Sequence, residues 1–365
     1  MRASSYGAVL AAAAKCEAQR RLGRPVVPYK LEFILTFSCQ SRCKTCNIWS
    51  RYIEAPERQA DELSADEVIR AATSAREHAR WISLTGGEIT DRPDLVEIVG
   101  GIMAGAGEGL AMMNFTTNGI HPERVEEVFP KILAQTGALP VFVSVSLDGL
   151  GETYEEVRGV PEGYERVRSS MATLRRLQAA YPSLSVSHQL TISRFNLDQA
   201  EAIFEAALAA GDPPTVTLAT DAFQLTRGKQ GVDLRPRADE VAPLVQRLAK
   251  RFSLTAPSSL PPRAYLGSVE RYLETGEAPL PCVAGYATLT IDPYGKALQC
   301  DSHDLTLGDL REHDLDIVAL ARSEGYQEAL KQGANCRACW TPCQAYPTLM
   351  HHPVSSTLQV MKTLR

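Results

Sequence analysis

The sequence predicts an α/β protein: a partial, TIM-like (β/α)6 barrel followed by a small cysteine-rich module that contains a β-hairpin and a helix. Three observations predict this fold. From Leu31 onward, strand-like runs alternate with helix-like segments, which is typical of a parallel sheet. The predicted strands carry polar residues at every second position. Finally, cysteines gather in two groups, one after the first strand and one near the C-terminus.

The N-terminal segment predicts one amphipathic helix and a connector. Tyr6, Val9, Leu10 and Ala13 follow the i, i+3, i+4, i+7 spacing of a helix face, and Pro25 opens the connector. This alanine-rich run resembles the apolar core of a signal peptide. Only Val9 and Leu10 in it are strongly hydrophobic, however, so we expect a helix that stays in the protein.

Six strands are expected in the barrel, with helices between them. A capping box at Ser64 and Glu67 predicts the start of one of these helices. The strands are predicted at Leu31–Leu35, Trp81–Thr85, Leu110–Thr116, Val141–Leu147, Leu184–Ile192 and Thr215–Leu218.

The side-chain alternation indicates an open barrel that holds a polar ligand. In the fourth strand Val141, Val143 and Val145 share one face, whereas Ser144 and Ser146 share the other. A closed eight-stranded barrel fills its interior with branched apolar side chains. A doubly wound sheet with no ligand inside would be apolar on both faces. The polar concave face therefore favours a partial barrel with its site at the carboxyl ends of the strands.

Three cysteines follow the first strand in a C-x3-C-x2-C pattern: Cys39, Cys43 and Cys46. Soft thiolate ligands select iron–sulfur clusters or zinc. Three thiolates on a cubic [4Fe-4S] cluster leave one iron open to an outside molecule, whereas a structural site closes its coordination sphere. A zinc knuckle, or three cysteines that are merely buried together, is the alternative.

This cysteine pattern, on a loop after a first strand, resembles the radical S-adenosylmethionine (SAM) superfamily. The resemblance implies that the amino and carboxylate groups of SAM chelate the open iron. One position departs from the family pattern: Thr45 stands where an aromatic residue usually lies near the adenine, and Trp49 is a candidate substitute.

Further motifs at the strand ends extend the resemblance. Gly86, Gly87 and Glu88 match the GGE motif, whose backbone holds the SAM amino group. Arg158 resembles the arginine that pairs with the SAM carboxylate, and Arg194 is its rival for that role. The resemblance and the polar strand face together imply a SAM site made of Thr45, Gly86, Gly87, Glu88, Asn118, Ser144, Ser146, Asp148, Arg158 and Arg194.

The C-terminal module contains a predicted hairpin over residues 287–300 and five cysteines. Their spacing resembles the SPASM/twitch extension of the superfamily, whose full form has seven cysteines and two auxiliary clusters. Five cysteines imply one auxiliary [4Fe-4S] cluster; a zinc ribbon is the alternative. Four thiols close a cluster, so one is left over, and Cys343 is a candidate for a spare catalytic thiol. The predicted ligands come from Cys282, Cys300, Cys336, Cys339 and Cys343.

The expected domain division has four parts. Residues 1–30 form the N-terminal helix and connector, and residues 31–235 form the partial barrel. Residues 236–281 form a helical linker, and residues 282–365 form the auxiliary-cluster domain.

The resemblance implies reductive cleavage of SAM and hydrogen abstraction, with one electron supplied by flavodoxin or ferredoxin. The leading substrate is a small polar metabolite of the aminocyclitol or sugar type, which would be dehydrogenated or epimerised. Maturation of a ribosomal peptide, lipid modification, and a non-enzymatic electron-transfer or structural metal protein are the alternatives. Net charge is −5 without charge blocks, and no run suits a membrane span, so neither nucleic acid nor membrane is expected. Clustered cysteines without a secretory signal indicate the cytoplasm.

Overall fold

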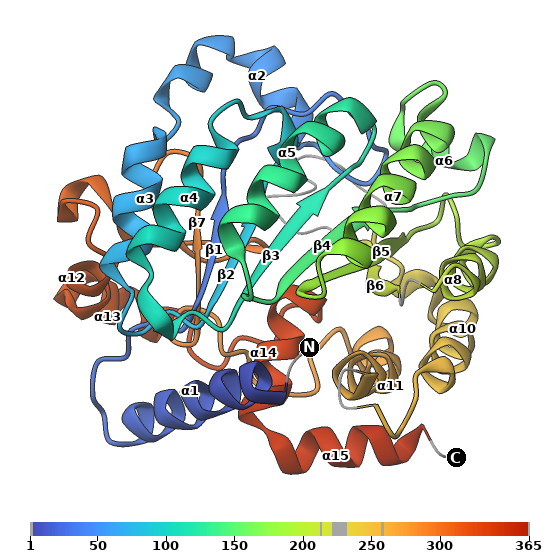
Figure 1. The fold of residues 1–365 in the computed structure, drawn as a ribbon. Coiled ribbons are helices and arrows are strands. Elements are labelled where there is room, and N and C mark those ends of the chain that lie inside the picture. The colour runs from blue at the N-terminus through green and yellow to red at the C-terminus, as the bar shows by residue number, and fades with distance from the viewer. Residues whose placement is uncertain (1–2, 212–213, 221–231, 257–258, 364–365) are drawn as a thin grey trace.

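A single mixed sheet forms the centre of the protein (Figure 1). The computed structural model describes residues 3–211, 214–220, 232–256 and 259–363. In this part of the chain nine strands lie in the order β6-β5-β4-β3-β2-β1-β7-β8-β9. The strands are β1 (Lys30–Ile34), β2 (Trp81–Thr85), β3 (Met112–Thr117), β4 (Val141–Ser146), β5 (Leu184–Ile192), β6 (Thr215–Leu218), β7 (Thr288–Ile291), β8 (Lys296–Cys300) and β9 (His303–Asp309).

Helices cover one face of the sheet and close one of its ends. Helices α3, α4, α5 and α7 lie side by side over β1 to β5, whereas α1, α11, α14 and α15 gather at the end away from α2 (Figure 1). The longer helices are α1 (Ala3–Arg21), α3 (Ala65–Ser74), α4 (Leu95–Gly105), α5 (Pro122–Thr136), α7 (Gly163–Ala180), α8 (Ala200–Ala209), α10 (Ala238–Arg251), α11 (Leu260–Thr275), α14 (Pro342–His351) and α15 (Pro353–Lys362). The shorter ones are α2 (Arg51–Glu54), α6 (Glu152–Arg158), α12 (Ile317–Arg322) and α13 (Glu324–Gln332).

The six parallel strands of the barrel confirm the fold prediction. The predicted bounds of β2, β5 and β6 are the observed ones, and those of β1, β3 and β4 differ by no more than two residues. Neighbouring strands from β1 to β6 all pair in parallel. On β4, Val141, Val143 and Val145 are fully buried against helices, while Ser144 and Ser146 remain partly exposed on the concave face.

The N-terminal helix and the capping box predicted from the sequence are also observed. The predicted N-terminal helix is α1, in which Val9 and Ala13 are buried. Ser64 caps α3, and its side chain accepts from the Glu67 amide, which confirms the capping box. None of the helices in the described ranges is long and apolar enough to cross a membrane.

The C-terminal hairpin extends the barrel sheet, which the sequence did not predict. Strand β7 pairs in parallel with β1, with Thr288 opposite Lys30. Strand β8 then pairs antiparallel with β7, and the unpredicted β9 pairs antiparallel with β8. Because β8 runs back along β7, its last residue, Cys300, lies level with the start of β1. The two predicted cysteine groups are therefore at opposite ends of the barrel.

Candidate active site

The thiol loop, residues 35–50, contains Cys39, Cys43 and Cys46. The loop follows β1 and pairs with the end of α6: the Arg42 amide donates to the Arg158 carbonyl at 2.9 Å, and the Lys44 amide to the Val157 carbonyl at 2.8 Å. Gly159 is required at this contact. It has φ +64°, and a Cβ there would lie 2.7 Å from the Arg42 backbone oxygen. The end of α6 thus fixes the position of the loop.

The Cys43 thiol is buried, those of Cys39 and Cys46 are half-buried, and the three act on one another electrostatically. Burial raises the pKa of Cys39 to about 11 and that of Cys43 to about 12, and neighbouring thiols add to both shifts. The Arg158 guanidinium opposes the shift at both cysteines. Several thiolates in a poorly solvated loop are stable only beside positive charge. A bound metal supplies that charge and deprotonates the thiols that coordinate it. The donor set therefore suits an iron–sulfur cluster.

The two glycines after β2 lie directly against the thiol loop. The Gly87 amide donates to the Thr36 carbonyl and the Glu88 amide to the Ser38 carbonyl, both at 2.8 Å. A Cβ on Gly87 would lie 2.0 Å from the Ser38 oxygen, and one on Gly86 would lie 2.5 Å from the Thr36 oxygen. Only glycine fits at this approach, so the motif shapes the thiol loop itself.

The Glu88 carboxylate is fully buried and accepts four hydrogen bonds. Its donors are the Thr90 amide (3.0 Å) and hydroxyl (2.7 Å), the Thr117 hydroxyl (2.7 Å) and the Asn118 amide (2.7 Å). Burial raises the pKa of Glu88, while these hydrogen bonds lower it. The side chain thus ties the end of β2 to the end of β3.

Asn118 connects β3 to the thiol loop. Its Nδ2 lies 3.2 Å from Ser41 Oγ, 3.4 Å from Gln40 Oε1 and 3.9 Å from Cys39 Sγ. An amide donor near a thiolate stabilises its negative charge. The structure thus brings Asn118 and the GGE motif together with Cys39.

Arg158 and Asp148 form a buried pair next to the thiol loop. Arg158 Nη1 lies 2.9 Å from Asp148 Oδ2, and the Thr191 amide donates to Asp148 Oδ1 at 2.7 Å. Arg158 Nε is buried and has no hydrogen-bond partner among the described residues. Such a guanidinium can take a second carboxylate, which is what a bound SAM would present.

The rival arginine has a different environment. Arg194 is exposed, and its guanidinium lies 4.7 Å from the centre of the Phe195 ring. A stacked, solvated guanidinium is an ordinary surface feature. We therefore favour Arg158 for the carboxylate contact.

The remaining predicted SAM contacts are spread along the concave face. Ser144 Oγ lies 3.2 Å from Ser187 Oγ, one inward-facing position further from the thiol loop than Ser146. Thr45 is partly exposed on the loop. The nearby Trp49 donates from its indole nitrogen to the Cys46 carbonyl at 3.0 Å, so its ring is held on the thiol loop.

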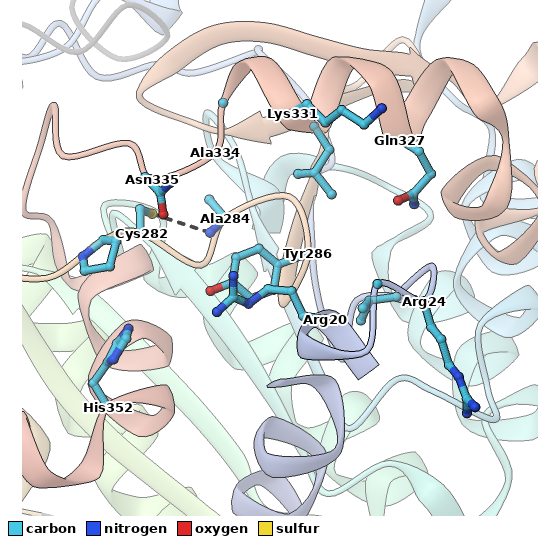
Figure 2. A pocket seen from close by; sticks show the side chains of 15 residues that line it. Arg20, Arg24, Cys282, Ala284, Tyr286, Gln327, Lys331, Ala334, Asn335 and His352 are labelled. Carbon is cyan, nitrogen blue, oxygen red and sulfur yellow. Dashed lines mark hydrogen bonds between the residues drawn. The ribbon is translucent and has the colours of Figure 1, made fainter. Parts of the chain in front are cut away.

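The second cysteine group lies beneath the other end of the barrel. The Cys282 amide donates to the Cys336 carbonyl at 2.9 Å, and Cys282 Sγ accepts from the Ala284 amide at 3.4 Å. Figure 2 shows Cys282 at a surface pocket of about 270 Å³ whose lining includes Arg20 and Tyr286. Burial raises the pKa of Cys282 to about 11 and that of Cys339 to about 12, and the charge of Cys282 adds to the Cys339 shift.

Cys343 differs from the other four cysteines of this group. It lies in the first turn of α14, and its carbonyl accepts from Lys30 Nζ of β1 at 2.8 Å. Burial raises the pKa of its thiol. The charges of Asp301, Glu32 and Lys30 affect this pKa more than any neighbouring cysteine does. Cys343 thus lies toward the barrel strands.

A buried charged group, Lys30, Glu32 and Asp301, was missed by the sequence analysis. Lys30 Nζ lies 3.3 Å from Glu32 Oε2, with the two side chains only 3% and 7% exposed. Burial raises the pKa of Asp301 to about 6, and Glu32 adds to the shift. One signal was available: two charged residues at alternate positions of a strand point to the same face.

The thiols do not converge on one point. Within the described ranges, no group of three or more Cys, His, Asp or Glu side chains surrounds a single metal-ion position. A four-iron cube takes its thiolates at separate corners.

Comparison with known proteins identifies the family. Residues 33–207 match the radical SAM superfamily, and residues 282–340 match the SPASM iron–sulfur cluster-binding domain. The chain belongs to the radical SAM superfamily. The two matches support a SAM site with a [4Fe-4S] cluster in the first domain and an auxiliary iron–sulfur cluster in the second. The SPASM match ends before Cys343.

Two curated relatives and two solved structures illustrate the likeness. The sporulation killing factor maturation protein SkfB of Bacillus subtilis (strain 168) is 28% identical over 189 residues, 51% of this chain and 41% of that protein. The AdoMet-dependent heme synthase of Methanosarcina barkeri is 31% identical over 188 residues, 50% of this chain and 48% of that protein. The chain thus spans less than half the length of these relatives.

The structures share the fold. Native anSMEcpe with bound AdoMet and Cp18Cys peptide has a TM-score of 0.57 at 14% identity, covering 84% of this chain and 83% of that one. Streptococcus suis SuiB bound to S-adenosylmethionine has a TM-score of 0.57 at 16% identity, covering 86% and 70%.

Proposed function

We propose that this enzyme cleaves SAM reductively at the thiol loop and uses the resulting radical to take a hydrogen atom from an unactivated carbon of its substrate. The observation that carries the proposal is the buried Arg158 Nε, which has no partner among the described residues and lies near Cys43. Cys39, Cys43 and Cys46 would hold the cluster, which would supply one electron to SAM and an open iron for the amino and carboxylate groups of SAM.

The residues around this site position and shield the reactants. Arg158 receives a carboxylate while Asp148 holds its other edge, so the guanidinium is fixed before SAM binds. Asn118 places an amide donor beside Cys39. The buried Glu88 network keeps the ends of β2 and β3 closed to water.

For the substrate, the leading candidate is a small polar metabolite of the sugar or aminocyclitol type. In a dehydrogenation, the substrate radical loses a proton and a second electron; the cysteines of the second group would hold an auxiliary cluster that could accept this electron. In an epimerisation, a thiol returns a hydrogen atom instead. Because Cys343 lies toward the barrel strands, it is the thiol that could do so.

Peptide maturation is the second candidate. A relative named as a maturation protein, SkfB, and a fold-level likeness to an enzyme solved with a bound peptide favour it. A panel of candidate substrates separates the two: we expect consumption of either a sugar-type alcohol or a peptide to be coupled to 5′-deoxyadenosine formation.

The partners follow from the chemistry. We expect flavodoxin or ferredoxin to supply the first electron. All nine cysteines are free of disulfides, which agrees with a reducing cytoplasm.

The test uses protein reconstituted without oxygen. The parent should form 5′-deoxyadenosine from SAM and a chemical reductant, and the triple variant Cys39→Ala, Cys43→Ala, Cys46→Ala should form none. A Cys16→Ala variant is the matched control, because Cys16 lies on α1 and its thiol contacts the Tyr286 carbonyl at the end of the barrel opposite the thiol loop. Cleavage of SAM by the triple variant at the parent rate would refute the assignment of the thiol loop.

A further inference from the structure

A cavity lies at the end of the barrel opposite the thiol loop. Its volume is about 290 Å³, and its walls come from β2 to β5, the start of β6, and helices α1, α11 and α14. We call it the lower chamber. It opens on the same concave face as Ser146 and Asn118, since the inward side chains of each strand share one face.

One wall of the lower chamber is a row of uncharged polar side chains. Asn114, Ser144, Ser185, Ser187 and Thr215 line it, each from a strand. Asn114 Oδ1 already accepts from the Trp81 indole at 2.9 Å, and Ser144 and Ser187 share one hydrogen bond. Hydroxyl groups both donate and accept, so this row can still bind ligand hydroxyl or amide groups.

The helices add apolar lining. Val9 of α1, Phe252 after α10 and Met350 of α14 line the chamber, and Phe142 of β4 adds an aromatic ring on the strand side. Ligand pockets typically combine such a lining with a few polar groups that set orientation. The chamber therefore suits a ligand that has an apolar part and a polar part.

The chamber is also uncharged. Among the described residues that line it, none is Asp, Glu, Lys, Arg or His. The nearby Lys30 and Glu32 are buried and paired with each other, and Lys30 Nζ lies 4.8 Å from the centre of the Trp81 ring. A charged ligand group placed here would lose its hydration without gaining a counter-ion, which is costly.

We propose that the lower chamber is the substrate-recognition site and that it selects an uncharged ligand carrying hydroxyl or amide groups next to an apolar part. This inference rests on the proposed function and deepens it. Ser146 lies two residues, or about 7 Å, along β4 from Ser144 toward the thiol loop. A ligand held in the chamber therefore points one end at the SAM site. A protonated aminocyclitol is disfavoured, whereas a neutral glycoside or a neutral peptide segment fits.

Binding of matched probes tests this selectivity. The probes are n-butyl glucoside, which is neutral, its protonated glucosamine analogue and its anionic glucuronate analogue, titrated by calorimetry into the cluster-loaded full chain with SAM. We expect the neutral probe to bind about ten-fold more tightly than either charged one. Equal or tighter binding of a charged probe overturns the proposal.

A negative charge placed in the chamber should change the order of the binding affinities of the probes. Ser185→Asp should favour the cationic probe over the neutral one, by about ten-fold relative to the parent. The control Ser253→Asp, at an exposed position outside the chamber, should keep the parent order. If Ser185→Asp, folded by circular dichroism, also keeps the parent order, the proposal is refuted.

A capped neutral tripeptide with a central leucine is a further probe, which tests whether the chamber prefers a peptide or a metabolite. Tighter binding of the peptide than of the glucoside assigns the chamber to a peptide, and the reverse assigns it to a neutral metabolite; binding of neither refutes the chamber. SAM cleavage is measured on the same sample. Cleavage without probe binding refutes the chamber alone, whereas probe binding without cleavage refutes the proposed function alone.

Discussion

Glu88 shows how one buried side chain can organise the strand ends around a site. Its carboxylate joins Thr90, Thr117 and Asn118, and its backbone amide holds Ser38 of the thiol loop. A buried carboxylate with four donors is stable only when all of them are in place. The GGE motif thus acts first as a clamp between β2, β3 and the cluster ligands.

The clamp predicts a specific effect of Gly87→Ala. The added methyl group would lie 2.0 Å from the Ser38 carbonyl oxygen, so the thiol loop must move. We expect loss of about four irons per chain, the content of one cluster, with the auxiliary cluster retained. Iron analysis and Mössbauer spectroscopy check this. Gly325→Ala is the control, because a Cβ there meets nothing within 4 Å; normal iron content in Gly87→Ala would contradict the clamp.

Measurements of SAM affinity can decide whether Arg158 or Arg194 binds the SAM carboxylate. Because Arg158→Gln alone leaves Asp148 buried without its cation, the informative variant is Arg158→Gln with Asp148→Asn. We expect this double variant to bind SAM at least about ten-fold more weakly, since one charge-assisted contact is lost. Asp148→Asn alone and Arg194→Gln are the controls. A large loss in Arg194→Gln, with normal binding in the double variant, would reverse the assignment.

The five cysteines of the second group should divide four to one. We expect single alanine variants of Cys282, Cys300, Cys336 and Cys339 to lose the auxiliary cluster, and Cys343→Ala to keep it, because Cys343 lies toward β1. Iron content of the five variants measures this. Iron loss in Cys343→Ala would make Cys343 a ligand. Kept iron and 5′-deoxyadenosine with lost product would favour epimerisation, and parent-like turnover would favour dehydrogenation.

At the scale of elements, α1 closes one end of the barrel through a small number of polar contacts. Glu17 accepts from Arg20 and Arg21 at 2.8 to 2.9 Å and lies 3.9 Å from His351 Nδ1 of α14. The next contact is a cation–π pair, with Arg20 5.2 Å from the Tyr286 ring centre. The contacts to His351 and Tyr286 join α1 to the rest of the protein, and Val9 of this helix lines the lower chamber.

Glu17 makes the stability of the protein depend on pH. Its hydrogen bond to Arg20 lowers its pKa to about 2, so the carboxylate is charged in the folded protein where the unfolded chain takes up a proton. The stabilisation is therefore present above about pH 4.5 and is lost as the pH falls toward 2. We expect the thermal midpoint of Glu17→Gln to fall less between pH 5 and pH 3 than that of the parent. Parallel pH profiles would contradict this.

The elements and the parallel barrel sheet were largely predictable, and the pairing of the C-terminal strands with that sheet was not. The period-two pattern at Val141 to Ser146 located β4 and its polar face, because alternation is a local property. The pairing of β7 with β1 joins residues far apart in the sequence, and no local pattern encodes it. Strand β9 was missed because its apolar residues are few. The contacts of Glu88 and Asp301 are equally long-range, so the sequence could name Glu88 but not its partners.

At the scale of the whole molecule, the barrel separates two redox sites. The thiol loop follows the end of β1, and Cys343 contacts Lys30 at its start. The five residues of β1 span about 3.3 Å each, and the thiol loop adds to this length. The two cysteine groups are therefore roughly 20 Å apart. The inward polar face and the lower chamber lie between them. In the proposed function, a substrate in the barrel would meet the radical at one end and an electron acceptor at the other.

This separation predicts that the two clusters can be removed independently. We expect about eight irons per chain in the parent and about four in the Cys39, Cys43, Cys46 triple alanine variant. The complementary variant, Cys282→Ala with Cys300→Ala, should also hold about four irons and still cleave SAM, because these two cysteines and the thiol loop lie at opposite ends of the barrel. It should form 5′-deoxyadenosine without product, since the second electron has no acceptor. Zinc in place of the second set of irons, in protein prepared without oxygen, would refute the auxiliary-cluster chemistry and leave the first site unaffected.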